Sequence, residues 1–444
     1  MGTMAMPKLI LTMSLPIMFS MMISALYNIV DSMFVARWSE DALQAVSLAF
    51  PVQTLVIAVA TGTGVGMNSL LSKSLGEKDY EKANKAAHNT IFVCGLSYLV
   101  FALFAVLFSE TFFRLQTSDP VVIGYGKSYL FITTICCLGV FVNIIGERLL
   151  QGTGRTTLSM VSQLSGAVTN IILDPIMIFG LCGFPEMGIK GAAIATVTGQ
   201  IVGAILATFL NLRYNKEISL DMSKFRPEMS LIKTIYRVGL PSIIMQSVMS
   251  FTTFFLDKIL LLVEPSGVGV NVYGIYFKLQ SFIFMPVFGL NNGIVPIVAY
   301  NYGARNKKRI VSAIKIGVIS AVCIMGAGTL FFQIKPEILV ALFHPSEALL
   351  KLAVPALKIL SISFMAAGYS ITMGSVFQAL GNGVYSLVTT TIRQIIVILP
   401  VAYLLGTTIG IGAIWWAMPI AECAAVVTTT IFFLRIFRQK VRGL

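Results

Sequence analysis

Long apolar segments recur along the whole chain, and they are the feature that most constrains its fold. Each is long enough for a helix of about 20 residues, which crosses the roughly 30 Å hydrocarbon core of a membrane. Because lipid offers the backbone no hydrogen-bond partners, each segment is predicted to be a helix. Twelve can be placed, at 9–36, 43–72, 86–108, 121–147, 158–182, 189–212, 232–263, 270–298, 311–332, 352–379, 386–406 and 411–434. The predicted fold class is therefore an all-α integral membrane protein with twelve transmembrane helices.

Composition agrees with a chain that resides in lipid. Of its 444 residues, 56% are hydrophobic and only 11% are charged, whereas soluble domains carry about 25% charged residues. The net charge of +13 could suggest a nucleic-acid partner, but no long basic tract is interleaved with aromatic residues. Basic residues also collect in the cytoplasmic loops of membrane proteins. We therefore expect the lipid bilayer, and no nucleic acid, as the partner.

The distribution of Lys and Arg predicts the orientation of the chain. Basic residues gather after the second, sixth and eighth apolar segments and at the C-terminus, while the alternate loops hold few. Since positively charged loops stay in the cytoplasm, both termini are predicted to be cytoplasmic. The expected location is the cell membrane, as a multi-pass protein and a monomer.

An internal repeat divides the chain into halves. The longest polar segment, 213–231, is the predicted cytoplasmic linker between an N-terminal lobe, 1–212, and a C-terminal lobe, 232–444. Because each lobe has an even number of helices, both enter the membrane in the same sense, and a pseudo-two-fold axis along the membrane normal should relate them. Four marks recur at offsets of 225 to 227 residues: Pro16 with Pro241, Gly76 with Gly303, 151–154 with 378–381, and Pro175 with Pro400.

Two acidic residues lie inside predicted spans. Asp31 is the only charged residue in the first apolar segment, and Asp174 is the only one in the fifth. Asn28 and Asn170 precede them by three and four residues, which places each amide on the same helix face as its acid. An ionisable group inside a span costs at least about 2.5 kcal/mol and is a functional candidate by default.

The depth of the two acids suggests a cation site. Both fall in the outer halves of their helices, where two carboxylates would repel each other. A bound Na⁺ or one shared proton would relieve that repulsion. The alternative is that each acid satisfies a helix terminus or pairs with a loop cation, for which Arg37 and Lys190 are the candidates.

The order and spacing of several motifs resemble the multidrug and toxic compound extrusion (MATE) family. The resemblance covers essentially the whole chain and implies two six-helix lobes that export drugs in exchange for H⁺ or Na⁺, without a cofactor. The motifs are LP early in the first and seventh segments, a Gly-containing polar loop after the second and eighth, VDSMFVAR at 30–37, QGTGRT at 151–156, NIILDPIMIFG at 170–180 and GIKGAAIAT at 188–196.

The resemblance also implies roles for individual residues. Asp31 and Asp174 match the coupling pair of the family's N-terminal half, and Asn170 matches a polar position of that site. Thr196 is a further candidate, and Pro16 is a candidate point of helix bending. Some branches of the family also carry an acidic residue midway along the tenth helix. None lies in this chain's stretch, SFMAAGYSITMGSVFQALG at 363–381, which resembles the DinF-like branch, where coupling is confined to the first half.

Other charges near the predicted spans receive different interpretations. Glu147 and Glu264 stand at predicted helix ends and are expected at the membrane interface. Asp257 is the repeat partner of Asp31, but Lys258 follows it directly. We therefore expect Asp257 in an ion pair or at the interface rather than in a second coupling site.

Flexible thioether and aromatic side chains suit a promiscuous pocket for lipophilic cations. The same residue types also face lipid or pack between helices, and this alternative remains open for each of them. The candidates for substrate binding are Tyr27, Met33, Gln53, Met249, Phe254 and Gln280.

The predicted function is a cation-coupled antiporter that exports lipophilic or cationic drugs by alternating access. The first alternative is a flippase for lipids or lipid-linked oligosaccharides, which would need several cavity cations to hold phosphates. Only Lys278 and Arg393, within the eighth and eleventh segments, are plausible cavity cations, and they either snorkel or meet Asp257 or Glu422. A channel would show rings of like charge or a repeated filter sequence, and neither occurs. With no His/Cys/Asp metal set and no nucleophile motif, an enzyme is not expected, and the possible Na⁺ at Asp31 and Asp174 is the only metal considered.

Overall fold

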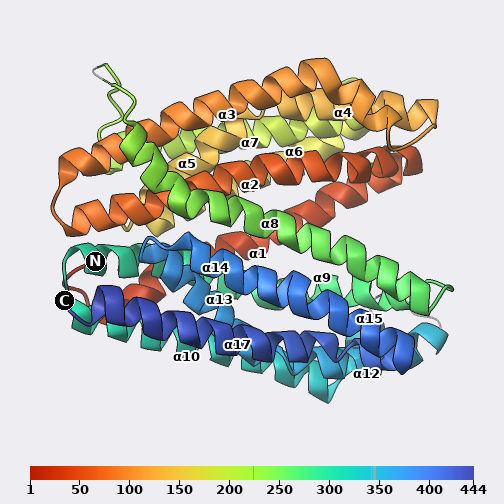
Figure 1. Ribbon diagram of the computed structural model, residues 1–444. Coiled ribbons are helices and arrows are strands. Elements are labelled where there is room, and N and C mark those ends of the chain that lie inside the picture. Colours follow the sequence, from red (N-terminus) through yellow and green to blue (C-terminus); the bar gives the residue numbers. More distant parts are fainter. Residues whose placement is uncertain (224, 342, 344–346) are drawn as a thin grey trace. The chain divides into compact units, whose positions relative to one another are not determined.

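The computed structural model describes residues 1–223, 225–341, 343 and 347–444, and every regular element among them is a helix (Figure 1). Ten of these helices are long and apolar enough to cross a membrane. The number rises to twelve when each of two bent helix pairs is counted as one span. The predicted all-α membrane fold is therefore confirmed.

One compact unit, called here the N-terminal unit, comprises Phe19–Gly239. It contains most of the first helix, six further helices and the beginning of α8. Their bounds are α1 Met6–Trp38, α2 Glu40–Gly76, α3 Tyr80–Arg114, α4 Pro120–Ile135, α5 Leu138–Gly152, α6 Thr156–Phe179, α7 Ile189–Tyr214 and α8 Met229–Val263.

The C-terminal unit comprises Met1–Met18 together with Leu240–Leu444. It contains the start of α1, the larger part of α8 and all later helices. These are α9 Val268–Gly303, α10 Lys307–Ile334, α11 Pro336–Ala341, α12 Glu347–Ser361, α13 Phe364–Ala379, α14 Gly383–Thr391, η1 Ile392–Ile398, α15 Leu399–Thr408, α16 Ile411–Ile414, α17 Ala417–Ile436 and η2 Phe437–Val441, where η marks a π-helix.

Two helices belong partly to each unit. The assignment changes within α1 after Met18 and within α8 after Gly239, close to the helix-internal prolines Pro16 and Pro241. Proline removes one hydrogen bond of a helix and is a common point of bending. The lobes predicted from connectivity, 1–212 and 232–444, keep every helix whole, and they remain a proposal beside these contact-based units.

The two bent pairs occur at matching places in the repeat. The segment predicted as one span at 121–147 consists of α4 and α5, which meet at 45°. The segment predicted at 352–379 consists of α12 and α13, which meet at 48°. The breaks at 136–137 and 362–363 are 226 residues apart, so the structure repeats this bend at the offset found in the sequence.

The loops after α2 and α9 repeat in the same way. Lys78 and Arg305 adopt left-handed backbone conformations, with φ of 61° and 53°. The next residues, Asp79 and Asn306, each accept a hydrogen bond from a backbone N–H in the first turn of the following helix, at 3.0 and 3.2 Å. Such N-caps satisfy donors that have no partner inside the helix. The sequence repeat is therefore also a repeat of local structure.

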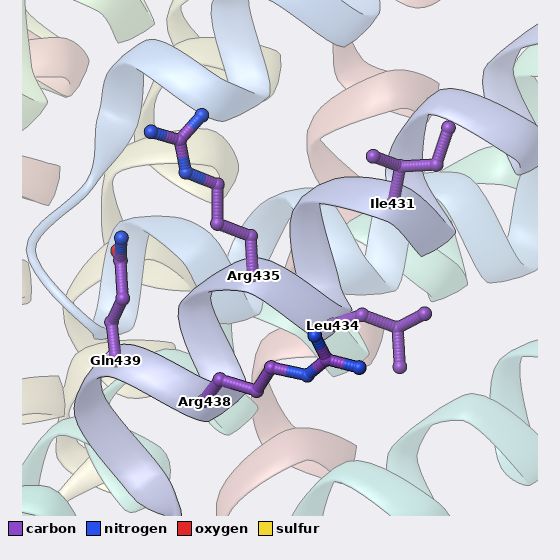
Figure 2. Close-up of a pocket in the computed structure, with 5 residues that line it drawn as sticks. All are labelled: Ile431, Leu434, Arg435, Arg438 and Gln439. Carbon is purple, nitrogen blue, oxygen red and sulfur yellow. The ribbon is translucent and has the colours of Figure 1, made fainter.

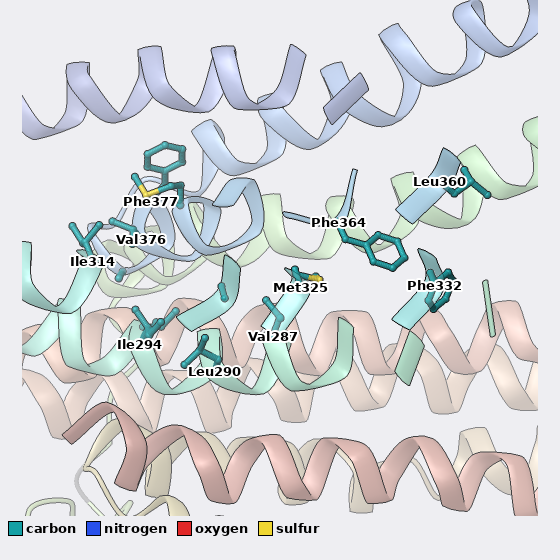
Figure 3. Close-up of a cluster of buried hydrophobic side chains, with 14 of the residues drawn as sticks. Val287, Leu290, Ile294, Ile314, Met325, Phe332, Leu360, Phe364, Val376 and Phe377 are labelled. Atoms are coloured by element: carbon teal, nitrogen blue, oxygen red, sulfur yellow. The ribbon is translucent and has the colours of Figure 1, made fainter. Parts of the chain in front are cut away.

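A hydrophobic cluster fills the interior of the C-terminal unit (Figure 3). Many of its side chains come from α9, α10, α12 and α13, and several are fully buried. They include Val287, Leu290, Ile294, Ile314, Met325, Phe332, Leu360, Phe364, Val376 and Phe377.

In the N-terminal unit, α6 and α7 approach closely at Gly166 and Gly199, where a Cβ on Gly199 would lie 2.6 Å from the Gly166 oxygen. Small residues permit such contacts in membrane helices.

Candidate functional site

One face of α1 carries polar groups at helical spacing. Ser20, Ser24, Tyr27 and Asp31 recur every three or four residues, so they lie along one side of the helix. The Gln163 amide of α6 donates to Ser24 Oγ at 3.0 Å, and its side-chain oxygen accepts from the Ser20 hydroxyl. These bonds hold the polar face of α1 against α6 within the N-terminal unit.

The face of α6 that meets α1 is polar in the same way. Gln163, Asn170 and Asp174 follow one another at spacings of seven and four residues. Pro175 does not interrupt the helix, which continues to Phe179 and ends at Gly180 in a left-handed conformation, with φ of 70°. Asp174 is therefore held by a regular helix, about one and a half turns before its C-terminal end.

The two helices bring the predicted acids together. The side chains of Asp31 and Asp174 are joined by a hydrogen bond, and Asp174 is fully buried. Asn170 lies beside them, because its amide donates to Asp174 Oδ1 at 3.1 Å and lies 3.5 Å from Thr196 Oγ1 on α7. Three helices thus converge on one small group of oxygen atoms.

Several of these oxygen atoms have no partner of their own. Within the described part of the chain, Asp31 Oδ1, Asp174 Oδ2 and Asn170 Oδ1 are buried without a hydrogen bond. A hydrogen bond between two carboxyl groups requires one shared proton, and oxygens of this kind also bind small hard cations. The arrangement can therefore hold a proton or a monovalent cation between α1 and α6.

Two tyrosines border the acid pair. Tyr27 on α1 and Tyr129 on α4 both lie within electrostatic range of Asp31 and Asp174. The Gln53 amide of α2 donates to the Tyr129 hydroxyl at 3.1 Å. Two of the predicted substrate-binding residues, Tyr27 and Gln53, are thus near the acids or one contact removed from them, while Tyr129 was missed by the sequence analysis.

Comparison with known proteins agrees with this architecture. The sequence matches the MatE family over residues 16–176 and 241–404, which covers most of both halves. The chain belongs to the MATE family of membrane transporters. It is consequently a transporter and not an enzyme.

Individual relatives of this MATE chain cover nearly its full length. It is 28% identical to the multidrug export protein MepA of Staphylococcus aureus over 437 residues, which is 96% of this chain and 94% of MepA. A crystal structure of MATE in complex with MaD3S superimposes with a TM-score of 0.91 at 25% identity, covering 97% of this chain and 96% of the other. An outward-facing multidrug resistance MATE transporter superimposes with a TM-score of 0.90 at 25% identity, covering 97% and 95%.

Asn28 and Met33, two candidates on the first helix of this MATE transporter, do not contact the acid pair through any hydrogen bond that the structure describes. Asn28 is exposed, and its amide donates to the backbone oxygen of Ser24 at 2.9 Å. Met33 is also exposed. Sequence spacing placed Asn28 within reach of Asp31, but an Asn side chain can equally bond to its own helix backbone.

In the C-terminal unit of the MATE chain, one predicted charge pairing occurs. Arg393 Nη1 lies 3.0 Å from Glu422 Oε1. Lys278 instead lies over the ring of Phe343, 5.8 Å from its centroid. Lys258 lies over the ring of Phe254, 5.6 Å from its centroid.

The remaining candidates on α8 and α9 are partly or largely exposed. Asp257 and Gln280 are half-buried, whereas Met249 and Phe254 are exposed. Their roles in substrate binding stay predictions. A depression on the surface of this unit lies elsewhere, near the end of α17 (Figure 2), and is lined by Ile431, Leu434, Arg435, Arg438 and Gln439.

The predicted helix end at Glu147 is wrong, because α5 continues to Gly152, and Glu147 is only 8% exposed within the protein. Its placement at the membrane interface stays a prediction. Glu264 is half-exposed in the turn directly after α8. The signal that could have found Glu147 is the apolar residues that continue past it, Leu149 and Leu150.

Proposed function

We propose that this MATE transporter exports lipophilic and cationic drugs in exchange for H⁺ or Na⁺, with Asp31 and Asp174 as the coupling site. The observation that carries the proposal is the meeting of the two carboxyl groups inside the N-terminal unit, beside Asn170 and Thr196. A buried pair of acids is unfavourable unless something neutralises it, so the pair should bind and release a cation readily. Coupling requires that property.

The substrate class is proposed from similarity. The relative named above is a multidrug export protein, and one of the similar structures is a multidrug resistance transporter in an outward-facing conformation. An alternating-access cycle across the cell membrane is the corresponding proposal for this chain. The basic loops support an orientation with both termini in the cytoplasm.

The acid pair can act on the shape of the unit through α1. A cation held between α1 and α6 favours their close contact, and its release leaves two like charges that repel each other. The same helix contains Pro16, next to the point where α1 passes from the C-terminal to the N-terminal unit. We propose that α1 bends at Pro16 as the pair changes its occupancy, which would couple the cation to drug release.

The alternative of a lipid flippase has less support. Phosphate binding would call for basic side chains that are available to the substrate. Arg393 already lies 3.0 Å from a Glu422 oxygen, and Lys278 lies over the ring of Phe343. Both cations considered for phosphate thus have neighbours within the C-terminal unit.

The decisive experiment is efflux of a cationic dye from everted membrane vesicles, with a pH gradient and a Na⁺ gradient imposed separately. Asp31→Asn and Asp174→Asn are expected to abolish gradient-driven efflux, because each removes a carboxylate from the pair. The gradient that drives the wild type identifies the coupling ion. Undiminished efflux in both variants would reject the coupling assignment.

Asp221→Asn is the matched control. Asp221 lies outside the spans, in the segment between α7 and α8. A hydrogen bond from the Ser223 backbone N–H lowers the pKa of Asp221 below its usual value, so this carboxyl is ionised at neutral pH. The control removes a real negative charge by the same substitution, and efflux is expected to stay at the wild-type rate.

A further inference from the structure

A third carboxyl group is buried in the N-terminal unit. Glu147 on α5 has one side-chain oxygen within a hydrogen bond of the Asn143 side chain. Its other oxygen, Oε1, is buried, and no residue that the structure describes bonds to it. Asn143 in turn accepts from Ser162 of α6 at 3.3 Å. An ionisable group placed this way inside a span is expensive and calls for a function.

The charged and titratable neighbours of Glu147 come from two helices. Arg148 follows it on α5, and its Nη1 donates to Gln151 Oε1 at 3.1 Å. Tyr27 on α1 lies within electrostatic range of Asp31, Glu147 and Asp174. Tyr27 therefore interacts electrostatically with both the acid pair and the third carboxyl.

Glu147 lies toward the opposite end of the unit from the acid pair. It is five residues before the end of α5 at Gly152, or about 7.5 Å at 1.5 Å per residue. Asn143, the hydrogen-bond partner of Glu147, contacts Ser162 near the start of α6. Asp174 is twelve residues further along α6, or about 18 Å. Ser24 and Gln163 add polar groups along the α1–α6 contact between these levels.

We propose that Glu147 is a second proton carrier, which receives the proton released by the Asp31–Asp174 pair and passes it toward the cytoplasmic end. This inference rests on the proposed function and deepens it, because it specifies the coupling ion as a proton. An amide N–H and a guanidinium are hydrogen-bond donors, so neither can coordinate Na⁺. Both can stay beside a glutamate that alternates between its charged and neutral forms.

The transfer balances in charge and bonds. The O–H bond of the shared carboxyl proton breaks, each relay hydroxyl between the two levels accepts one proton as it gives up its own, and a new O–H bond forms on Glu147. The acid pair is left with one more negative charge, and Glu147 becomes neutral beside Arg148. Release of the proton from Glu147 to solvent then restores the negative charge next to the guanidinium.

The test uses the purified full-length transporter in proteoliposomes with a cationic dye. Glu147→Gln is expected to lower efflux driven by a pH gradient by about 100-fold, the scale of a lost proton-transfer group. Dye-for-dye exchange without a gradient should persist, because it needs no net proton movement. Glu264→Gln is the matched control at a half-exposed position and should behave as the wild type.

Two further variants separate proton transfer from a structural role. Glu147→Asp keeps a titratable group and should recover part of the driven efflux. Glu147→Gln combined with Arg148→Gln should stay inactive, since it removes both charges but supplies no carrier. Recovery in this double variant would mean that Glu147 only balances Arg148, and the inference would fail. Loss of exchange in both Glu147→Gln and Glu147→Asp would likewise overturn it in favour of a structural role.

The outcome also distinguishes this inference from the proposed function. Full proton-driven efflux in Glu147→Gln, together with lost efflux in Asp31→Asn, would refute the second carrier and leave the coupling pair intact. A wild type driven by Na⁺ alone would refute it as well. Retained efflux in both Asp31→Asn and Asp174→Asn would instead reject the coupling assignment on which the inference rests.

Discussion

Neutralising Glu422 alone should destabilise the C-terminal unit more than neutralising both Glu422 and its ion-pair partner Arg393. Arg393 in η1 and Glu422 in α17 form an ion pair at 3.0 Å, and both side chains are 12% exposed. Among the described residues, Arg393 Nε and Glu422 Oε2 are buried without a further partner. The pair therefore depends on its one close contact.

The expected magnitude follows from this geometry. At 3.0 Å and an effective dielectric constant of about 20, two unit charges attract by roughly 5.5 kcal/mol before desolvation is counted. Glu422→Gln leaves a buried guanidinium without a counter-charge, which should cost about 3–5 kcal/mol. The double variant Arg393→Gln/Glu422→Gln leaves no buried charge, so its loss should be about 1 kcal/mol or less.

The assay is the temperature at which half of the purified protein loses its monodisperse peak in size-exclusion chromatography. Glu422→Gln should fall well below the wild type, with the double variant between them. Glu110→Gln is the control, because Glu110 pairs with Lys127 at 2.6 Å on the surface and such pairs contribute about 1 kcal/mol at most. Equal losses in the single and double variants would refute the reasoning.

Further predictions concern backbone positions. Gly199→Ala should destabilise the protein by about 1–3 kcal/mol through overpacking, because its Cβ would meet the Gly166 oxygen at 2.6 Å. The control is Gly95→Ala, whose Cβ would meet nothing within 4 Å. It should not lower the temperature at which half of the monodisperse peak is lost. Gly154→Ala and Gly381→Ala should each cost about 1–2 kcal/mol, since their φ values are 85° and 73°. Similar losses at these two matched positions would support the repeat, and no loss at either in thermal unfolding would contradict the strain argument.

The architecture could be predicted because each membrane helix is recognisable from its own run of apolar residues. The apolar segments correspond to the spans found, and the offset of 225 to 227 residues reappears in paired bends, in Lys78 and Arg305, and in Gly154 and Gly381. The bends themselves were not predicted. The segments 121–147 and 352–379 are apolar throughout, and hydropathy does not reveal a change in helix direction.

The geometry of the candidate site was predicted in part, and its two failures have different causes. Asp31, Asp174 and Asn170 were identified, because a charge in an apolar run stands out and helical spacing fixes which residues share its face. Asn28 shares the face of Asp31 by the same rule, yet it bonds to its own helix. The burial of Glu147 was not predicted, because its helix continues five residues beyond the expected end at 147.

By itself the sequence determined that the chain crosses the membrane repeatedly, that its halves repeat, and which helix face carries each acid. These properties depend on residues near one another in the chain. Only the tertiary structure decided that the faces bearing Asp31 and Asp174 meet, and that Tyr27 lies near a third carboxyl at Glu147. Spacing along a helix fixes where a side chain points, but its partner depends on packing between segments more than a hundred residues apart.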